Sequence, residues 1–213
     1  MNEPSLPLRR AADTLVAAIA LRLSHGVRPL VVAIDGRSGS GKSTLAALVA
    51  PAVGGTIVPS DDFFAATIPD SGWEARTMAE RSADALDWRR LRAEALEPLR
   101  AGKPAQWRAF DFAGGIRPDG TYAMQSEPTR RPSSSVILLD GAYSAGPALA
   151  DLIDLAVLIE APQRLRDARL AARENPRFLA QWHARWDGAE DHYFSDVRPA
   201  ASFHLVLAPA TAE

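Results

Sequence analysis

The stretch "VVAIDGRSGSGKST", residues 31–44, decides the fold of this chain. Its apolar, β-branched first half continues a run that starts at Pro29, and it predicts a central strand buried on both faces. Its second half, from Gly36 to Ser43, matches the Walker A pattern G-x-x-x-x-G-K-[ST]. A strand, a glycine-rich loop and a helix in this order predict a site for a nucleoside triphosphate.

The residue types in this loop suit a triphosphate and a magnesium ion. Glycines let successive backbone N–H groups point inward at phosphate oxygens, and the start of the next helix adds the positive end of its dipole. Lys42 would bridge the β- and γ-phosphates, and the Ser43 hydroxyl would bind Mg²⁺. The residues predicted to bind the nucleotide are Gly36, Ser38, Gly39, Ser40, Gly41, Lys42, Ser43 and Thr44.

The rest of the chain alternates buried strands with helices. Apolar runs predict strands within 29–35, 55–64, 135–141, 152–162 and 202–209. Helical spacing predicts helices over 8–25, 42–53 (ending near Pro51), 87–102 and 163–174. This alternation indicates an α/β fold with a mostly parallel, doubly wound sheet. Residues 103–134 are rich in Pro, Gly and Ser and predict a β-ribbon or lid-like excursion.

Length and composition narrow the function classes. The chain has 213 residues, 47% of them apolar, which suits one domain with a substantial core. A net charge of −2 argues against nucleic acid as a partner. No stretch is long and apolar enough for a membrane span, and there is no cysteine for a disulfide or thiolate site. We expect a cytoplasmic protein that binds neither membrane nor nucleic acid.

Three aspartates follow predicted strands. Asp140 ends the apolar run "VILLD", so it is expected to complete the metal site with Ser43. Asp61 and Asp62 follow the second strand, at the carboxyl edge of the sheet where sites form in open α/β folds. One would take a proton from the acceptor hydroxyl and the other would help to hold Mg²⁺. Asp61 is the expected base and Asp62 a metal ligand, although the opposite assignment stays open.

The downstream arginines favour a kinase over other P-loop proteins. Arg169 and Arg173 lie four residues apart, on one face of a predicted helix, as expected for a lid that closes over a transferring phosphoryl group. A GTP switch would normally carry an N-K-x-D motif, and no Asn-Lys pair occurs here. A motor or assembly ATPase is usually larger. A small-molecule kinase therefore accounts best for these residues.

Several stretches occur in the order seen in uridine kinases and their phosphoribulokinase-like relatives, and residues 30–195 resemble this family. They are "AIDGRSGSGKST", "VPSDDFF", "SADALDWRRLRAEALEPLRAGKPAQWRAFDF", "VILLDGAY" and "RDARLAARE". The resemblance implies a P-loop fold with five parallel strands, a β-hairpin over the acceptor, an arginine lid, ATP as donor and often a homo-oligomer. It also implies Asp61 as base, Asp140 as the Walker B acid (usually Glu), and Arg169 and Arg173 as lid arginines.

The chain departs from the family where uridine is recognised. Glu80 and Arg81 stand where uridine kinases have the Phe-Asp pair that grips ribose, and Gly114 and Gly115 follow "FDFA", where the family usually has a histidine. The acceptor therefore stays open. The side chains expected around it are Phe64, Arg76, Phe110 and Tyr143.

We therefore expect one P-loop kinase domain over 1–213, with an acceptor-side excursion at about 62–134 and a lid at about 163–190. It would transfer the γ-phosphoryl group of ATP, with Mg²⁺, to a hydroxyl of a small molecule. Lys42, Asp61, Arg169 and Arg173 would be the catalytic residues. The alternatives are a regulatory ATPase without an acceptor site and a true uridine or cytidine kinase.

Overall fold

The computed structural model describes residues 5–26 and 29–209. Its centre is a five-stranded sheet in the order β2-β5-β1-β6-β7, and every neighbouring pair is parallel. The strands are β1 (Leu30–Asp35), β2 (Thr56–Pro59), β5 (Val136–Asp140), β6 (Leu155–Ile159) and β7 (Leu205–Leu207). The predicted α/β, doubly wound fold with five parallel strands is confirmed.

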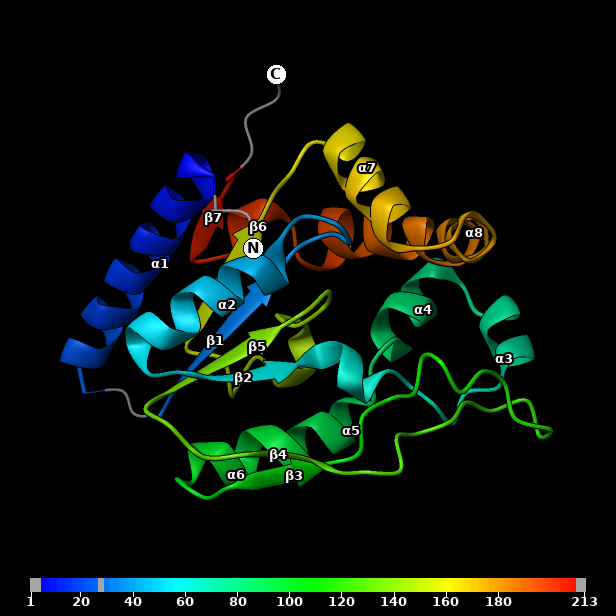
Figure 1. Ribbon diagram of the computed structural model, residues 1–213, viewed down its shortest axis with the longest axis horizontal. Coiled ribbons are helices and arrows are strands. Elements are labelled where there is room, and N and C mark those ends of the chain that lie inside the picture. Colours follow the sequence, from blue (N-terminus) through cyan, green and yellow to red (C-terminus); the bar gives the residue numbers. More distant parts are fainter. Residues whose placement is uncertain (1–4, 27–28, 210–213) are drawn as a thin grey trace.

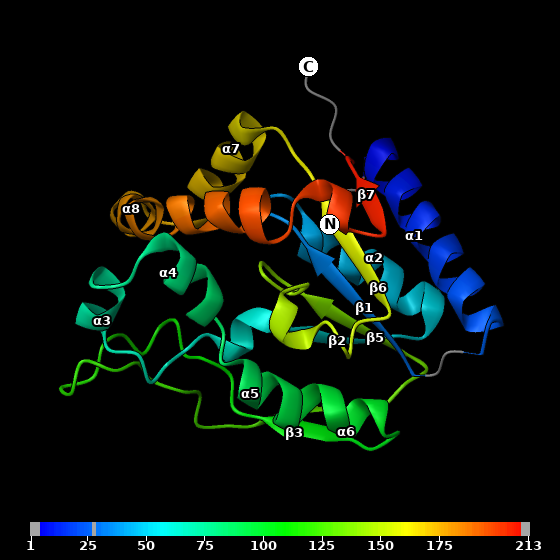
Figure 2. The same cartoon turned by 180° about the vertical axis from the view of Figure 1, so that it is seen from behind.

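Helices cover both faces of the sheet, which explains why the central strands are apolar on both sides (Figures 1 and 2). Val32 and Ile34 of β1 pack against α1 and α2 on one face, whereas Val31 packs against the α5–α6 segment on the other. All six residues of β1 are buried. The elements named here are α1 (Leu6–Ser24), α2 (Lys42–Val53), α5 (Trp88–Arg90), a π-helical segment η2 (Leu91–Leu96) and α6 (Glu97–Arg100).

The remaining elements lie beside the carboxyl edge of the sheet and along its edge strand β2. Helix α8 packs against α4 and α7 on one side, and the antiparallel pair β3–β4 lies with α5–α6 on the other (Figure 1). These elements are α3 (Asp70–Glu74), α4 (Met78–Asp84), β3 (Ala105–Trp107), β4 (Thr129–Arg131), α7 (Gln163–Arg173) and α8 (Pro176–His192). Single turns complete the chain: η1 (Ser60–Phe63), η3 (Pro147–Leu149), η4 (Tyr193–Val197) and η5 (Ala200–Ser202).

The parallel register brings three strand ends to one place. Ile34 of β1 and Pro59 of β2 are both aligned with Asp140 at the end of β5. The phosphate loop follows β1, and Asp61 comes two residues after β2. One edge of the sheet therefore carries the loop and both acidic positions, as the order of strands and loops predicted.

Two local features differ from the expected elements. Helix α2 continues past Pro51 to Val53 and ends at Gly54, whose φ of 59° is left-handed. Helix α4 was not predicted, although its "TMAE" start is a capping box in which Thr77 and Glu80 hydrogen-bond each other's backbone N–H groups. Among the helices of the described residues, none has the length and apolar character that a membrane crossing requires.

Candidate functional site

The phosphate loop connects β1 to α2 in a conformation that needs glycine. Gly39 has a φ of 77°, and a Cβ atom there would lie 2.7 Å from the carbonyl oxygen of Arg166. The Lys42 Nζ lies inside the loop and donates hydrogen bonds of 2.8 and 3.1 Å to the carbonyl oxygens of Gly36 and Arg37. The eight residues predicted to bind the nucleotide all lie in this loop or in the first turn of α2.

Helix α8 holds the outer side of the phosphate loop. The backbone N–H and hydroxyl of Ser38 donate to Oε1 of Glu190 over 3.1 and 2.6 Å. Arg37 forms an ion pair of 2.6 Å with Asp191. Glu190 is only 3% exposed, so its charge depends on these bonds for solvation. Helix α8 is thereby attached directly to the loop.

Asp35, the last residue of β1, hydrogen-bonds the first residue of the loop. This fully buried carboxylate accepts hydrogen bonds from the N–H groups of Gly36 (2.7 Å) and Ala145 (3.0 Å) and from the hydroxyl of Tyr193 (2.7 Å). Burial raises the pKa of Asp35 to about 6, against the opposing effect of these hydrogen bonds and of Lys42. Asp35 therefore ties β1, the segment after β5 and η4 together.

Asp140 and Ser43 form an oxygen-donor pair beside Lys42. Burial raises the pKa of Asp140, while a hydrogen bond from Ser43 and the charge of Lys42 lower it. Oδ1 of Asp140 is buried and has no hydrogen-bond partner within residues 5–26 and 29–209. A carboxylate oxygen that has no hydrogen-bond partner and lies next to a hydroxyl can bind a hard cation such as Mg²⁺.

The two adjacent aspartates face different surroundings. Asp61 is open to solvent, yet the crowding of protein around its carboxylate raises its pKa, and the charges of Lys42 and Arg173 lower it. Asp62 instead accepts a hydrogen bond of 2.7 Å from the indole Nε1 of Trp107. Of these two aspartates, Asp61 is the one whose pKa is lowered by the charge of Lys42. The two carboxylates thus differ in environment, which the sequence left open.

The two arginines predicted to form a lid, Arg169 and Arg173, occupy distinct positions. Arg169 donates from Nη1 to the carbonyl oxygens of Gly39 and Ser40, 3.0 Å each, so it touches the loop itself. Arg173 lies one turn further along α7, pairs with Glu174 over 2.7 Å and lines a cavity with Asp61. Both arginines are therefore near groups that would handle a phosphoryl group.

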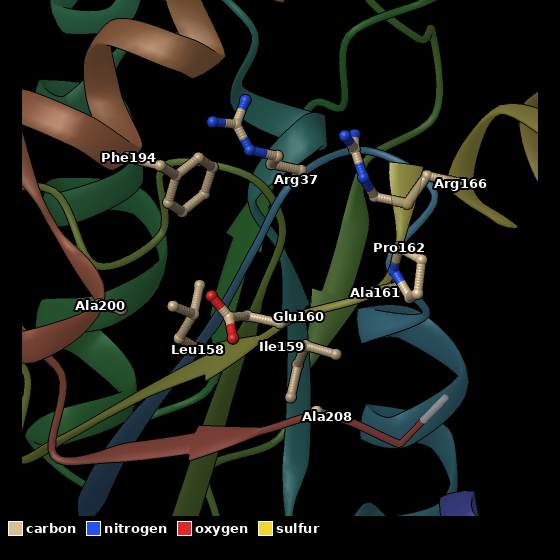
Figure 3. A pocket seen from close by; sticks show the side chains of 10 residues that line it. All are labelled: Arg37, Leu158, Ile159, Glu160, Ala161, Pro162, Arg166, Phe194, Ala200 and Ala208. Carbon is tan, nitrogen blue, oxygen red and sulfur yellow. The ribbon is translucent and has the colours of Figure 1, made fainter. Parts of the chain in front are cut away.

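A first cavity, of about 490 Å³, lies beyond the carboxyl end of β6 (Figure 3). Figure 3 shows Arg37 and Arg166 toward one end of it, Phe194 at its side and Ala208 at the opposite end. The cavity therefore begins at the phosphate loop and lies at β6 and β7, on the opposite side of β1 from the strands β2 and β5 that lead to the aspartates. Its lining residues are Arg37, Leu158, Ile159, Glu160, Ala161, Pro162, Arg166, Phe194, Ala200 and Ala208.

A second cavity, of about 570 Å³, lies between Asp61 and helices α7 and α8. Cavities of this size commonly hold small-molecule ligands. Asp61 and Arg173 form part of its wall together with several aromatic side chains. Its lining residues are Ser38, Asp61, Phe64, Ala85, Leu86, Phe112, Ala142, Tyr143, Leu170, Arg173, Glu174, Asn175, Leu179, Trp182, Trp186 and Glu190.

The four side chains expected around the acceptor divide into two groups. Phe64 and Tyr143 line the second cavity. Arg76 does not, because its guanidinium donates to Asp84 over 3.0 Å and lies over the ring of Trp73. Phe110 is also outside the lining and packs edge-on against Phe64, with ring centroids 5.1 Å apart. Phe110 therefore supports the wall of the cavity, whereas Arg76 is engaged outside it.

Sequence reasoning missed three residues that shape the site. They are Asp35, Glu190 and Tyr193, none of which is among the predicted site residues. Asp35 directly precedes the loop, and an acidic residue in a run of apolar strand residues was a signal that could have been used. Nothing in the sequence marks Glu190 as the partner of Ser38, because 152 positions separate them.

No protein-family model and no curated protein sequence matches this chain. Solved structures match it over most of its length. A possible uridine kinase from Bacillus stearothermophilus matches with a TM-score of 0.68 and 19% identity, over 94% of this chain and 98% of that one. A candidate fructose transport system kinase from Silicibacter sp. TM1040 matches with a TM-score of 0.59 and 21% identity, over 90% and 98%. The chain thus has the fold of uridine kinase-like P-loop kinases.

Proposed function

We propose that this protein is a kinase that transfers the γ-phosphoryl group of ATP to a hydroxyl group of a small molecule. The observation that carries the proposal is the position of Asp61, whose carboxylate lines a ligand-sized cavity together with Arg173 and lies within the electrostatic reach of Lys42. A base, a lid arginine and a phosphate loop thus meet at one cavity, which is what transfer to an acceptor requires. The kinase fold of the solved neighbours supports the same function.

The proposed magnesium site consists of Ser43 and Asp140. Their oxygens suit Mg²⁺, and the unpartnered Oδ1 of Asp140 has capacity for a ligand bond. When bound, Mg²⁺ would neutralise charge on the β- and γ-phosphates. Asp62 was expected to contribute as well, but its carboxylate is hydrogen-bonded to Trp107, so we leave it outside the proposed metal set.

In the proposed reaction, Asp61 accepts the proton of the acceptor hydroxyl as that oxygen forms a bond to the γ-phosphorus. The bond between the γ-phosphorus and the β–γ bridging oxygen breaks, and ADP leaves with those electrons. Lys42 and Arg173 stabilise the charge on the transferring group. Asp61 then returns its proton to water. The products are ADP and a phosphate ester.

We assign the first cavity to the base and ribose of ATP. It adjoins the loop at Arg37 (Figure 3) and lies at β6 and β7, on the opposite side of β1 from β2 and Asp61, so donor and acceptor would approach the phosphoryl group from different sides. Arg37 is held by its ion pair with Asp191 and lies over the ring of Phe194, which fixes this wall of the cavity. Its volume of about 490 Å³ is ample for a nucleoside.

The experiment that tests the proposal measures ADP release from Mg·ATP with a panel of nucleosides, sugars and small alcohols. We expect at least one acceptor to accelerate ADP release, and Asp61→Asn to abolish that acceleration. A regulatory ATPase would behave differently. If hydrolysis were the same with every acceptor and intact in Asp61→Asn, the kinase proposal would be wrong.

A further inference from the structure

The cavity beside Asp61 has a continuous aromatic wall. Phe64, from the segment after β2, lies at its centre, and its ring centroid is 5.2 Å from that of Trp186 on α8 and 6.2 Å from that of Phe112. Leu86 extends the wall next to Phe64. Rings at these distances form one apolar surface on which a flat or apolar body can pack. Ligand binding there would be driven mainly by burial of apolar area.

Two pairs of polar side chains in the wall of this cavity bind each other. Ser38 donates to Glu190 over 2.6 Å, and Arg173 pairs with Glu174 over 2.7 Å. Tyr143 also lines the cavity. Its hydroxyl is buried from solvent, so other atoms of this residue face the cavity. Arg173 and Asn175 also line the cavity, but most of its lining residues are apolar or aromatic, so the body of an acceptor would meet mainly apolar side chains.

Helix α4 ends beside the cavity, yet its charged residues are used elsewhere. Glu80 accepts hydrogen bonds of 2.8 Å from the N–H and the hydroxyl of Thr77. Arg81 is buried and donates to the carbonyl oxygens of Trp73 and Arg185, 2.9 Å each. Neither residue lines the cavity. They therefore give an acceptor with several hydroxyl groups no additional partner.

We propose, on the basis of the phosphotransfer proposed above, that the acceptor is an uncharged alcohol with an aromatic or otherwise apolar body, such as a hydroxymethyl arene. Its hydroxyl lies at Asp61 and its body packs against Phe64 and Trp186. A sugar or nucleoside would lose water from several hydroxyl groups against a mostly apolar wall, and this unfavourable desolvation weakens its binding. An alcohol with a hydrocarbon body has one polar group, the reacting hydroxyl, and that group is paired with Asp61.

The test compares acceptors in the wild-type protein. Benzyl alcohol, hydroxymethylpyridine and naphthylmethanol are assayed beside uridine, fructose and ribose at saturating Mg·ATP. We expect kcat/KM for at least one hydroxymethyl arene to exceed that for every sugar and nucleoside by about 10-fold or more. Preference for uridine or fructose, lost in Asp61→Asn, would overturn the acceptor class and leave the kinase function standing.

A matched pair of variants locates the preference in the cavity. Leu179→Asn places an amide in the cavity wall on α8, whereas Leu23→Asn makes the same change at a half-buried position of α1 away from it. We expect Leu179→Asn to reduce the ratio of kcat/KM between arene and sugar by about 10-fold and Leu23→Asn to leave it unchanged. An equal ratio in both variants would contradict the proposal.

A binding measurement separates this inference from the proposed function. If no alcohol were phosphorylated, the kinase proposal would fail, and calorimetric titration with naphthylmethanol and ribose would decide the inference alone. Saturable binding of naphthylmethanol that Leu179→Asn weakens supports an apolar ligand for this cavity. Absence of binding, or tighter binding of ribose, overturns it.

Discussion

The indole Nε1 of Trp107 donates a hydrogen bond of 2.7 Å to Oδ2 of Asp62 and so gives two adjacent carboxylates different surroundings. Trp107 is buried in β3, and its ring packs against Phe63, with centroids 5.4 Å apart. Asp62 is thereby tied to the β3–β4 ribbon. Asp61, its neighbour in sequence, is left to face the cavity and the phosphate loop.

This difference predicts unequal effects of the same substitution. Asp61→Asn should lower the acceptor-dependent rate by about 10²- to 10⁴-fold, because it removes the proposed general base. Asp62→Asn should lower it by less than about 10-fold, because an amide oxygen can still accept the bond from Trp107. Initial rates of ADP release with a phosphorylated acceptor measure both. Equal losses in the two variants would show that the assignment of the base is wrong.

The acid side of the pH–rate profile should respond to Arg173. The charge of this residue lowers the pKa of Asp61, so Arg173→Gln should raise that pKa. Because Asp61 acts as the ionised base, the acidic limb of log kcat/KM should then move to higher pH. Arg164→Gln, on the exposed side of the same helix, is the control and should leave the limb in place. An unmoved limb in Arg173→Gln would refute this coupling.

Glu190 should position the phosphate loop. Glu190→Ala leaves both the N–H and the hydroxyl of Ser38 without their acceptor, so we expect the KM for ATP to rise about 10-fold and the free energy of unfolding to fall by about 1–3 kcal/mol. Glu190→Gln keeps one acceptor oxygen and should recover most of the affinity for ATP. Asp187→Ala, on the same helix and paired with His183, is the control. A wild-type KM for ATP in Glu190→Ala would exclude this role.

Asp35 should make the protein less stable as pH rises through weakly acidic values. Its pKa of about 6 in the folded protein lies above the ordinary 3.8, so its contribution to stability is complete below pH 3.8 and is lost as pH rises through 6. The loss amounts to up to about 3 kcal/mol.

Asp35→Asn cannot ionise and should not show that loss. Urea unfolding at pH 4 and pH 7 tests this, because any effect of the substitution that is independent of pH cancels in the comparison. We expect the wild type to lose up to about 3 kcal/mol more than Asp35→Asn between these values. Parallel pH dependence of the two proteins would contradict the proposed titration of Asp35.

The sequence was sufficient for the sheet and the phosphate loop because both are encoded locally. The β1 run is apolar on both faces, so its burial under two helical layers follows from its composition. Gly39 needs its positive φ, and Lys42 follows it within one short motif. The parallel register then brings the ends of β2 and β5 to the same edge, so the placement of Asp61 and Asp140 was also predictable.

The partners of the site residues were not predictable, because they depend on packing between distant segments. Ser38 meets Glu190 only because α8 returns to the loop, and Asp62 meets Trp107 only because β3 passes beside η1. Arg76 has the chemistry of a ligand-binding residue, but Asp84 engages it. A residue's type in the sequence states what it can bind, and the fold decides which partner reaches it.

The fate of the γ-phosphoryl group tests the central claim most directly. The protein is incubated with Mg·ATP labelled at the γ-position and the alcohol panel, and the labelled products are separated by chromatography. For the wild type we predict label in an organic phosphate ester whose formation matches ADP release, and for Asp61→Asn label that stays on ATP. Label released only as inorganic phosphate, with every alcohol and in both proteins, would contradict the account.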